Sequence, residues 1–330
     1  MNITKSSDWN LECLGEYEET VYDIETENHM FFGNDILVHN SIYLEFAPVK
    51  EKFMKTETDR NKLTDFIDKV AIKLVEGTIN PAMNVLCDSL NTRNKTTNFD
   101  REAICIPSLK TGKCGFWIAK KRYYLECSDM EGYRYEEPHA KIMGLYCVQS
   151  SCPEILVEDF EQICHLITIE GVEETRSYLE TVKKKFFERK IEEIAFPKSV
   201  SDVTRYTDPK TDLPWNGLWY DPEMKKQRNG GVPIQSSSSI FYNYLVKKLN
   251  LHKKYQYIQD GDKIMFVYLK ENPYGFKTIA FKDELPPEFN LDEYIDKDVI
   301  WEKVFLSPVE DIFTACGYTL EPQLTMDDFF

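Results

Sequence analysis

The sequence predicts an α+β protein built from successive regions, and three observations support this class. Short β-prone segments separated by turn residues occupy the part of the chain before residue 41. A long stretch with helical spacing, Asp59–Asn91, is followed by further β-prone segments. Beyond Ser150, amphipathic helical patterns dominate. A chain of 330 residues has room for roughly two or three domains.

Composition limits the classes of protein that the chain can belong to. Hydrophobic and charged fractions of 42% and 29% are typical of a globular protein. The chain has no run of about 18 apolar residues and no apolar signal core at its start, so we expect an intracellular protein without a membrane partner. Nine cysteines without a CxxC pair predict reduced, mostly buried thiols rather than a zinc site.

The charge is unevenly distributed. One Lys against nine acidic residues gives a balance of −8 for residues 1–40, which leaves −8 of the total −16 for residues 41–330. An acidic balance counts against nucleic-acid binding over the whole surface. Any such binding therefore requires a local basic cluster.

The first forty residues contain β-prone segments at Val21–Thr26, Met30–Phe32 and Ile36–Val38, with a turn at Gly33–Asp35. Forty residues cannot bury a core alone, so we expect them to complete a sheet begun by another chain. The segment ends in a His-Asn-Ser junction.

That junction has the chemistry of a peptide bond that cleaves itself. The side-chain amide of Asn40 can attack its own carbonyl carbon, closing a succinimide and cutting the bond to Ser41. His39 can donate a proton to the departing amine, and the hydroxyl of Ser41 can accept an acyl group. The alternative is a terminal β-hairpin with ordinary surface histidines.

The segment from Val21 to Asn40 resembles the C-terminal half of a split intein, whose all-β Hint-type fold is completed by a partner chain. The resemblance implies that His29 exchanges a proton near the tetrahedral intermediate and that Asp23 helps to activate the upstream acyl step. It implies splicing without a cofactor, with the upstream half supplied by another polypeptide. The residues it assigns to splicing are Asp23, His29, His39, Asn40 and Ser41.

After the junction, Ser41–Ala47 alternates as a strand does. The following helical stretch carries an apolar stripe that includes Phe66, Val70 and Leu74, and we expect Pro81 to interrupt the helix. Phe99–Ile106 and Phe116–Cys127 are predicted as strands of an antiparallel sheet.

Four stretches in this part of the chain resemble the palm of family B DNA polymerases, especially the replicative polymerases of tailed phages. They are SIYLEF (41–46), NFDREAI (98–104), GFWIAKKRYYL (115–125) and DMEGYRYEEPHAKIMGL (129–145). The resemblance extends from Ser41 to the C-terminus. It implies template-directed synthesis from deoxynucleoside triphosphates on primer–template DNA, in the cytoplasm of an infected bacterial cell.

In that family an Asp-Thr-Asp signature stands immediately before the SIYL strand, and its carboxylates hold Mg²⁺. Here Asn40 occupies the position of the last Asp. The resemblance therefore implies that the catalytic aspartates and most of the Mg²⁺ site come from the N-terminal partner, and that splicing places them against Ser41.

A basic cluster with neighbouring aromatic residues provides the candidate DNA contact: Lys120, Lys121, Arg122 and Tyr123. On a strand, Lys121 and Tyr123 would share one face. The resemblance implies that Lys121 reaches the minor groove, where acceptors are present whatever the base pair, while Lys120 and Arg122 meet phosphates or packed carboxylates. The alternative is a solvated edge strand.

Further charged residues leave two interpretations open. Lys110 and Lys113 either extend the basic strip or belong to a solvated loop. The resemblance places four carboxylates near the catalytic metals as auxiliary groups, and structural ion pairs with the basic cluster are the alternative. These carboxylates are Asp100, Glu102, Asp129 and Glu131.

The region after about Ser150 has sequence patterns typical of helices. Ser151–Glu154 and Ser307–Glu310 fit the capping-box pattern. Glu173–Ile194 and Ser236–Leu249 are predicted as helices, and Tyr255–Leu269 gives a strand signal around a turn. This mixture resembles the mainly helical thumb of the same polymerase family, in which Lys183–Lys185 either touch phosphates or form an exposed helix face.

The last residues have the spacing of a sliding-clamp-binding peptide. Met326 and Phe329 lie one helical turn apart and suit an apolar pocket, while Gln323 can hydrogen-bond at its rim. The predicted clamp-binding residues are Gln323, Met326, Phe329 and Phe330. The alternative is an apolar tail that folds back on the thumb.

Together these patterns predict four regions: an intein fragment (1–40), a distal palm (41–145), a thumb (146–320) and a clamp-binding tail (321–330). The expected product is a DNA-directed DNA polymerase formed by trans-splicing at Asn40–Ser41, with the chain inactive alone. The competing hypothesis is a non-enzymatic DNA- and clamp-binding subunit that assembles without ligation.

Overall fold

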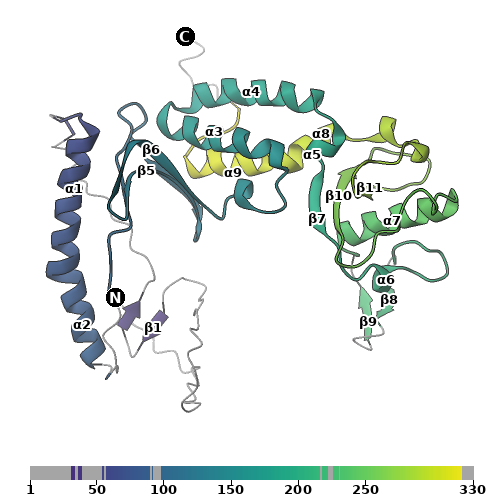
Figure 1. Cartoon of the computed structure of the whole chain (residues 1–330), viewed down its shortest axis with the longest axis horizontal. Helices are drawn as coiled ribbons and strands as arrows, with labels where there is room; N and C mark the ends of the chain where they lie inside the picture. Colours follow the sequence, from purple (N-terminus) through teal and green to yellow (C-terminus); the bar gives the residue numbers. More distant parts are fainter. Residues whose placement is uncertain are drawn as a thin grey trace, which may run out of the picture.

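The computed structural model describes residues 31–33, 36–38, 54–55, 57–89, 91, 98–215, 218–221, 226–229 and 231–321. The described elements form an elongated series: a long helix, a twisted antiparallel sheet, a group of packed helices and a distal α/β lobe (Figure 1). The α+β class predicted from the sequence is confirmed for this part of the chain. None of its helices is long and apolar enough to cross a membrane.

Within the first forty residues, the structure describes two short strands that pair with each other. Strands β1 (Phe31–Gly33) and β2 (Ile36–Val38) pair antiparallel, with Phe31 opposite Val38. Both strands lie where the β-prone segments predict them. The residues assigned to splicing and the predicted strand Ser41–Ala47 fall outside the described residues.

The predicted helix over Asp59–Asn91 is confirmed as α1 (Arg60–Leu74), a π-helical turn (Val75–Ile79) and α2 (Asn80–Ser89). Asp59 caps it, because its carboxylate accepts hydrogen bonds from the backbone N–H groups of the next turn. The predicted interruption at Pro81 is wrong: the helix continues. A wider π turn ends two residues before Pro81. Pro81 has no N–H to donate, and its ring would crowd the carbonyl group four residues earlier in a regular α-helix.

Four strands form the sheet that follows: β3 (Ala103–Cys105), β4 (Gly115–Ala119), β5 (Arg122–Met130) and β6 (Tyr133–Met143). Strand β4 pairs with the first half of β5 and β3 with its second half, while β6 pairs along β5. The prediction of one strand over Phe116–Cys127 is wrong. The chain reverses at Lys120–Lys121, where Ala119 stands opposite Arg122, so the segment is a hairpin.

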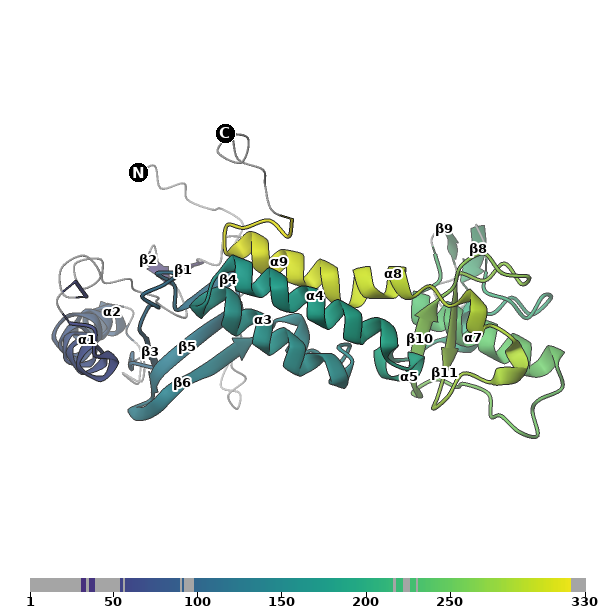
Figure 2. The same cartoon turned by 90° about the horizontal axis from the view of Figure 1, so that it is seen from above.

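Three helical segments pack beside one another next to the sheet (Figure 2). They are α3 (Val157–Ile169), α4 (Val172–Glu188) and a continuous helix made of α8 (Lys297–Trp301), a π turn (Glu302–Leu306) and α9 (Ser307–Ala315). Neither predicted capping box forms. Helix α3 begins only after a 3₁₀ turn at Glu154–Leu156, and Ser307 lies inside the last helix, whose cap is Asp296.

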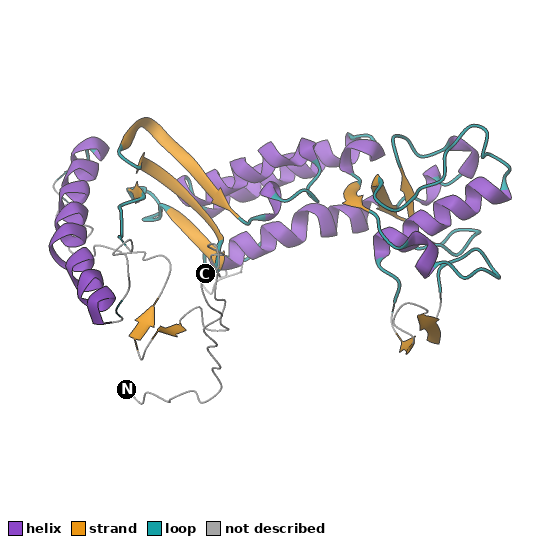
Figure 3. Ribbon diagram, turned by 60° about the horizontal axis from the view of Figure 1, so that its bottom comes forward, coloured by secondary structure: helices purple, strands orange, loops and turns teal. Residues whose placement is uncertain are grey.

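The distal lobe has more strand than the predicted mainly helical region. A three-stranded antiparallel sheet has the order β11 (Thr278–Phe281), β10 (Lys263–Tyr268), β7 (Phe196–Ser199), and α7 (Ile234–Lys248) packs on it. Figure 3 shows this lobe beyond the packed helices. The predicted helix Ser236–Leu249 is confirmed as α7. The strand signal over Tyr255–Leu269 is realised only in β10.

The smaller elements of this part are short. The predicted helix Glu173–Ile194 divides into α4 and α5 (Ile191–Ile194), separated by Arg189–Lys190. Helix α6 (Val203–Tyr206) precedes α7, and strands β8 (Leu218–Asp221) and β9 (Lys226–Asn229) form a separate hairpin. Further 3₁₀ turns lie at Tyr146–Val148, Pro287–Phe289 and Asp292–Tyr294.

One continuous hydrophobic core extends from the sheet through the packed helices to the distal lobe. Phe160 of α3 lies 4.3 Å, ring centroid to ring centroid, from Phe305 of the last helix, and Phe305 stacks on Trp301. Leu179, Val182, Phe186 and Ile194 of α4 and α5 are buried in this core. The packed helices are therefore fixed to the sheet by burial of apolar surface.

Candidate nucleic-acid interface

The basic cluster lies at the tip of the β4–β5 hairpin. Lys120 and Lys121 form its two-residue loop, and Lys121 has a left-handed backbone with φ of +56°. Lys121 is exposed and Lys120 is half-buried. The predicted alternation of these lysines on two faces of a strand is therefore wrong, because both belong to the turn. In a turn the two side chains do not occupy alternate faces of a sheet.

The aromatic members of the cluster are buried. Tyr123 is 7% exposed, and Tyr124 is 1% exposed and stacks on Phe116 with 5.7 Å between ring centroids. Burial and a hydrogen bond to Glu126 raise the pKa of Tyr124. The placement of Tyr123 leaves its ring little surface for a bound strand. The exposed aromatic ring of this hairpin is Trp117, which sequence reasoning missed.

Arg122 and the two upstream lysines make contacts with the packed helices. The Arg122 guanidinium lies 3.6 Å from the carboxylate of Asp311 in α9. Lys113 donates to the carbonyl oxygen of Cys316 at 2.6 Å and lies over the ring of Tyr318. Lys110 forms ion pairs with two glutamates of the α3–α4 segment, Glu170 and Glu174. Lys110 is exposed in a turn, as the solvated-loop alternative predicts, whereas Lys113 is half-buried and held against the end of the last helix.

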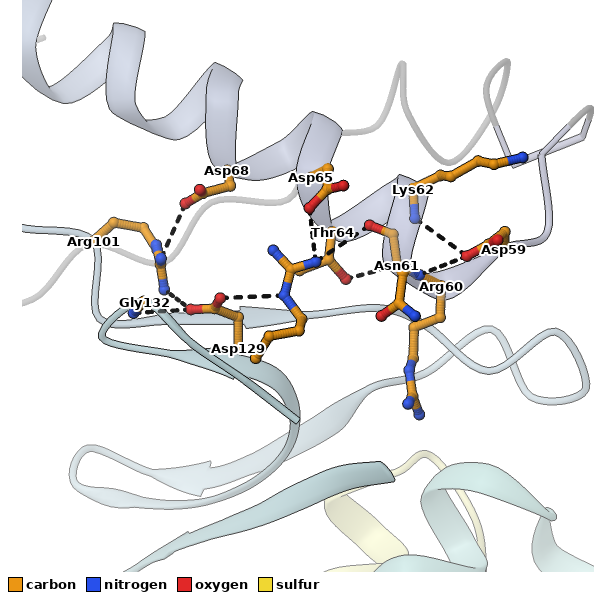
Figure 4. Close-up of polar contacts among 11 residues, drawn as sticks. Asp59, Arg60, Asn61, Lys62, Thr64, Asp65, Asp68, Arg101, Asp129 and Gly132 are labelled. Carbon is orange, nitrogen blue, oxygen red and sulfur yellow. Dashed lines mark hydrogen bonds and ion pairs between the residues drawn. The ribbon is translucent and has the colours of Figure 1, made fainter. Parts of the chain in front are cut away.

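A buried carboxylate lies at the opposite end of β5. The side chain of Asp129 is 3% exposed and accepts hydrogen bonds from Arg101, from Arg134 Nε at 3.3 Å and from the Gly132 N–H at 3.1 Å. Figure 4 shows these groups converging on Asp129 between α1 and the sheet. Two cations and a backbone donor compensate the burial of the carboxylate.

The same two arginines attach α1 to the sheet. Arg101 reaches Asp68 at 3.0 Å and Arg134 reaches Asp65 at 2.9 Å, so each bridges Asp129 and a carboxylate of α1 (Figure 4). The arginines were not singled out in the sequence. The signal for Arg101 was its position between Asp100 and Glu102, whereas nothing in the spacing pointed to Arg134.

The other three candidate carboxylates are on or near the surface. Glu102 pairs with Lys141 of β6. Glu131 is exposed in the β5–β6 turn, where its N–H donates to the carbonyl oxygen of Glu102 at 2.7 Å. Asp100 is exposed as well. The structure thus pairs Asp129 and Glu102 with Arg101, Arg134 and Lys141, and not with the Lys120–Arg122 cluster that the sequence suggested.

Metal-ligating groups are not gathered in the part of the chain that the structure describes, where no three His, Cys, Asp or Glu side chains are placed to hold an ion. None of the eight described cysteines forms a disulfide, and six of them are buried. Burial raises the pKa of Cys147 to about 11 and of Cys152 to about 12, as expected for the predicted reduced thiols.

Comparisons with known proteins indicate what the chain is similar to. No protein-family model matches the sequence. The DNA-directed DNA polymerase of Enterobacteria phage T4 is 31% identical over 329 residues, and that of Escherichia phage RB69 is 29% identical over 329 residues. Each match covers 98% of this chain and 34% of the phage protein. A DNA polymerase of Methanocaldococcus jannaschii is 25% identical over 348 residues, covering 96% of this chain and 18% of that protein.

The chain is similar to phage DNA polymerases. It spans about a third of the length of the two phage proteins that it matches. A match over 98% of the chain includes most of residues 1–40, so the comparison does not separate the leading segment from the rest. The intein and sliding-clamp hypotheses stay predictions, because the residues assigned to them lie outside the described part of the chain.

Proposed function

We propose that this chain is the C-terminal part of a DNA-directed DNA polymerase, carrying the distal palm and the thumb. It acts in template-directed nucleotidyl transfer after it is joined to an N-terminal polypeptide by protein trans-splicing at Asn40–Ser41. The observation that carries the proposal is the similarity of nearly the whole chain to phage DNA polymerases of which it spans only about a third.

The position of the junction supports trans-splicing. Asn40 and Ser41 stand directly before the SIYL segment, where the resemblance expects the last catalytic aspartate. Cleavage after Asn40 would leave Ser41 as the first residue of the ligated sequence, next to the partner's aspartates. Those aspartates would hold Mg²⁺, which supplies Lewis-acid stabilisation of the triphosphate.

In this proposal the described residues bind and orient DNA. The exposed Lys121 and its neighbour Lys120 project from the β4–β5 turn toward the duplex, with Lys121 at minor-groove acceptors. The Arg122–Asp311 contact couples the hairpin to α9. Asp129 and its two arginines hold α1 against the sheet, so that both lie in a fixed position beside the partner's metal site.

The test combines the purified chain with a companion polypeptide that carries the N-terminal polymerase part, ending in the first half of an intein. We expect a ligated product on a denaturing gel and primer extension that appears only with that product. Primer extension from a mixture that forms no covalent product would overturn trans-splicing and favour the non-covalent subunit. Ligation without primer extension would overturn the polymerase assignment.

The tail extends the proposal to a sliding clamp. Met326 and Phe329 would fill an apolar pocket of the clamp, and tethering would raise the effective concentration of the polymerase at its template. Deleting residues 323–330 should leave distributive synthesis by the joined product unchanged and remove the clamp-dependent increase in product length. Unchanged processivity after the deletion would refute this role.

A further inference from the structure

Gly144 lies immediately after β6, in contact with the basic turn. Its φ is +60°, in the left-handed region that side chains disfavour. A Cβ atom at this position would lie 2.3 Å from the carbonyl oxygen of Lys121 and 3.2 Å from Cγ of Arg122. Ordinary van der Waals contact begins at 3.4 Å, so any side chain here would displace the Lys121 peptide by about 1 Å.

The pairing of the strands explains this close approach. The last pair of the β5–β6 ladder is Tyr123 opposite Met143, so Gly144 continues β6 alongside the residues that leave the turn. Its carbonyl oxygen accepts a hydrogen bond from the Gln149 side chain at 3.3 Å. The backbone of Gly144 therefore has a second contact besides its close approach to the turn.

The turn itself has an unusual backbone. Seven non-glycine residues in the described ranges have a positive φ, and five of them are Asn or Asp, which tolerate this conformation best. Lys121 and Glu131 are the exceptions. A lysine in the left-handed region costs roughly 1–2 kcal/mol and persists only where its surroundings impose the conformation.

We propose that Gly144 is the positioning residue of the DNA-contacting turn. By letting its backbone lie against the Lys121 carbonyl, it confines the Lys120–Lys121 turn to one backbone conformation. The inference rests on the proposed function, because it assumes that these lysines contact DNA.

The decisive variant is Gly144→Ala in the full chain, measured by binding to primer–template duplex over a range of salt concentrations. We expect affinity about tenfold weaker, as for the removal of one charge-assisted hydrogen bond. We also expect the slope of log K against log salt to decrease by about 0.9 for each phosphate that the turn no longer neutralises. A purely structural role would lower stability without changing this slope.

A matched control separates the steric contact from backbone strain. Gly275 has a φ of +70°, and nothing lies within 4 Å of a Cβ built there. Gly275→Ala should destabilise the fold through the same backbone penalty and leave DNA affinity and salt slope unchanged. Gly144→Asn should remain defective, because asparagine tolerates the backbone but keeps the Cβ.

Two further variants keep the inference falsifiable and distinguish it from the proposed function. If Lys120→Ala/Lys121→Ala binds DNA as the unmodified chain does, the proposed function fails. If that variant loses binding while Gly144→Ala keeps both affinity and slope, the positioning role fails. Should Gly144→Ala not fold, adding Lys121→Gly should restore folding by relaxing the turn, and failure to restore it overturns the role.

Discussion

The two faces of the four-stranded sheet differ in how much of their apolar surface the described residues cover. On one face, Phe116 and Tyr124 belong to the continuous core that includes the packed helices. On the other, Tyr123, Leu125 and Cys127 form a small separate cluster. Trp117 and Met143, which stand opposite Tyr123 on this second face, are 44% and 43% exposed.

The helix formed by α1 and α2 is also only partly covered by the described residues. Its buried residues are Leu63, Thr64 and Cys87, whereas Phe66, Ile72 and Val85 remain largely exposed. Seven of the ten large apolar side chains found exposed among the described residues belong to residues 57–145. Burying apolar surface is favourable, so this open face can accept segments that lie outside the described residues or, under the proposed function, the partner polypeptide.

The largest effect is expected from a variant that cannot be joined to the N-terminal polypeptide by splicing. Asn40→Ala should abolish both release of residues 1–40 and formation of the ligated product, because no side-chain amide remains to close the succinimide. His39→Ala should slow the same step by roughly 10²–10⁴, the range for removal of a general acid. Band intensities on a denaturing gel after adding the companion measure both. Normal ligation by Asn40→Ala would remove the splicing hypothesis.

Neighbouring residues of β4 test the two faces directly. Phe116→Ala should lower the free energy of unfolding by about 3–5 kcal/mol, because it removes a 3% exposed ring from the closed face. Trp117→Ala, one residue along and on the open face, should cost much less in the chain alone. Urea unfolding measures both. Equal losses would show that the two faces are covered alike.

The buried carboxylate tests how α1 is held over the sheet. Asp129→Ala should destabilise by roughly 3 kcal/mol, because it leaves the Arg101 and Arg134 guanidinium groups without their shared partner. Asp65→Ala is the control: this side chain is 60% exposed, and its pair with Arg134 should contribute about 0–1 kcal/mol. Hydrogen exchange of the α1 amides should report the loosening. Comparable effects of the two variants would contradict a structural role for the burial of Asp129.

A substitution on the exposed side of α2 should have a smaller effect on stability, and the effect depends on whether the partner is present. Val85 of α2 is 69% exposed, so Val85→Ser should change the stability of the chain alone by no more than about 0.5 kcal/mol. If the partner covers this surface, the same substitution should lower the thermal stability of the joined product. An unchanged melting temperature of the joined product would place Val85 outside the interface.

The smallest effect lies in the distal lobe, remote from both faces. Hydrogen bonds from Lys254 and Tyr255 lower the pKa of Glu288 from 4.5 to about 2. A depressed pKa means that the carboxylate stabilises the fold above its unfolded pKa, and this stabilisation is lost as the pH falls from about 4.5 through about 2. Glu288→Gln should flatten the dependence of the urea midpoint on pH in that window. An identical pH profile would show that the pair contributes nothing.

Local patterns in the sequence were sufficient for three of the helical stretches and for the two strands β1 and β2. The spacing of apolar residues located α1–α2, α4 and α7, because apolar residues recur with the helical period, although the predicted stripe of α1 is not buried by the described residues. The β1–β2 hairpin followed from Gly33–Asp35. The composition of the cysteines was enough to predict reduced thiols.

Contacts between distant residues decided the rest. The Lys120–Lys121 turn interrupts a run of β-prone residues without any local turn signal; it forms where β4 pairs with β5 and where Gly144, more than twenty residues later, lies against it. The charged partners of Asp129 and Glu102 come from the segment before β3 and from β6, so no local spacing could identify them. The sequence by itself determined which segments are helical and which residues carry charge, because these depend on near neighbours. Only the tertiary structure decided which charges meet and which lysines face outward, because burial and pairing depend on segments far apart in the chain.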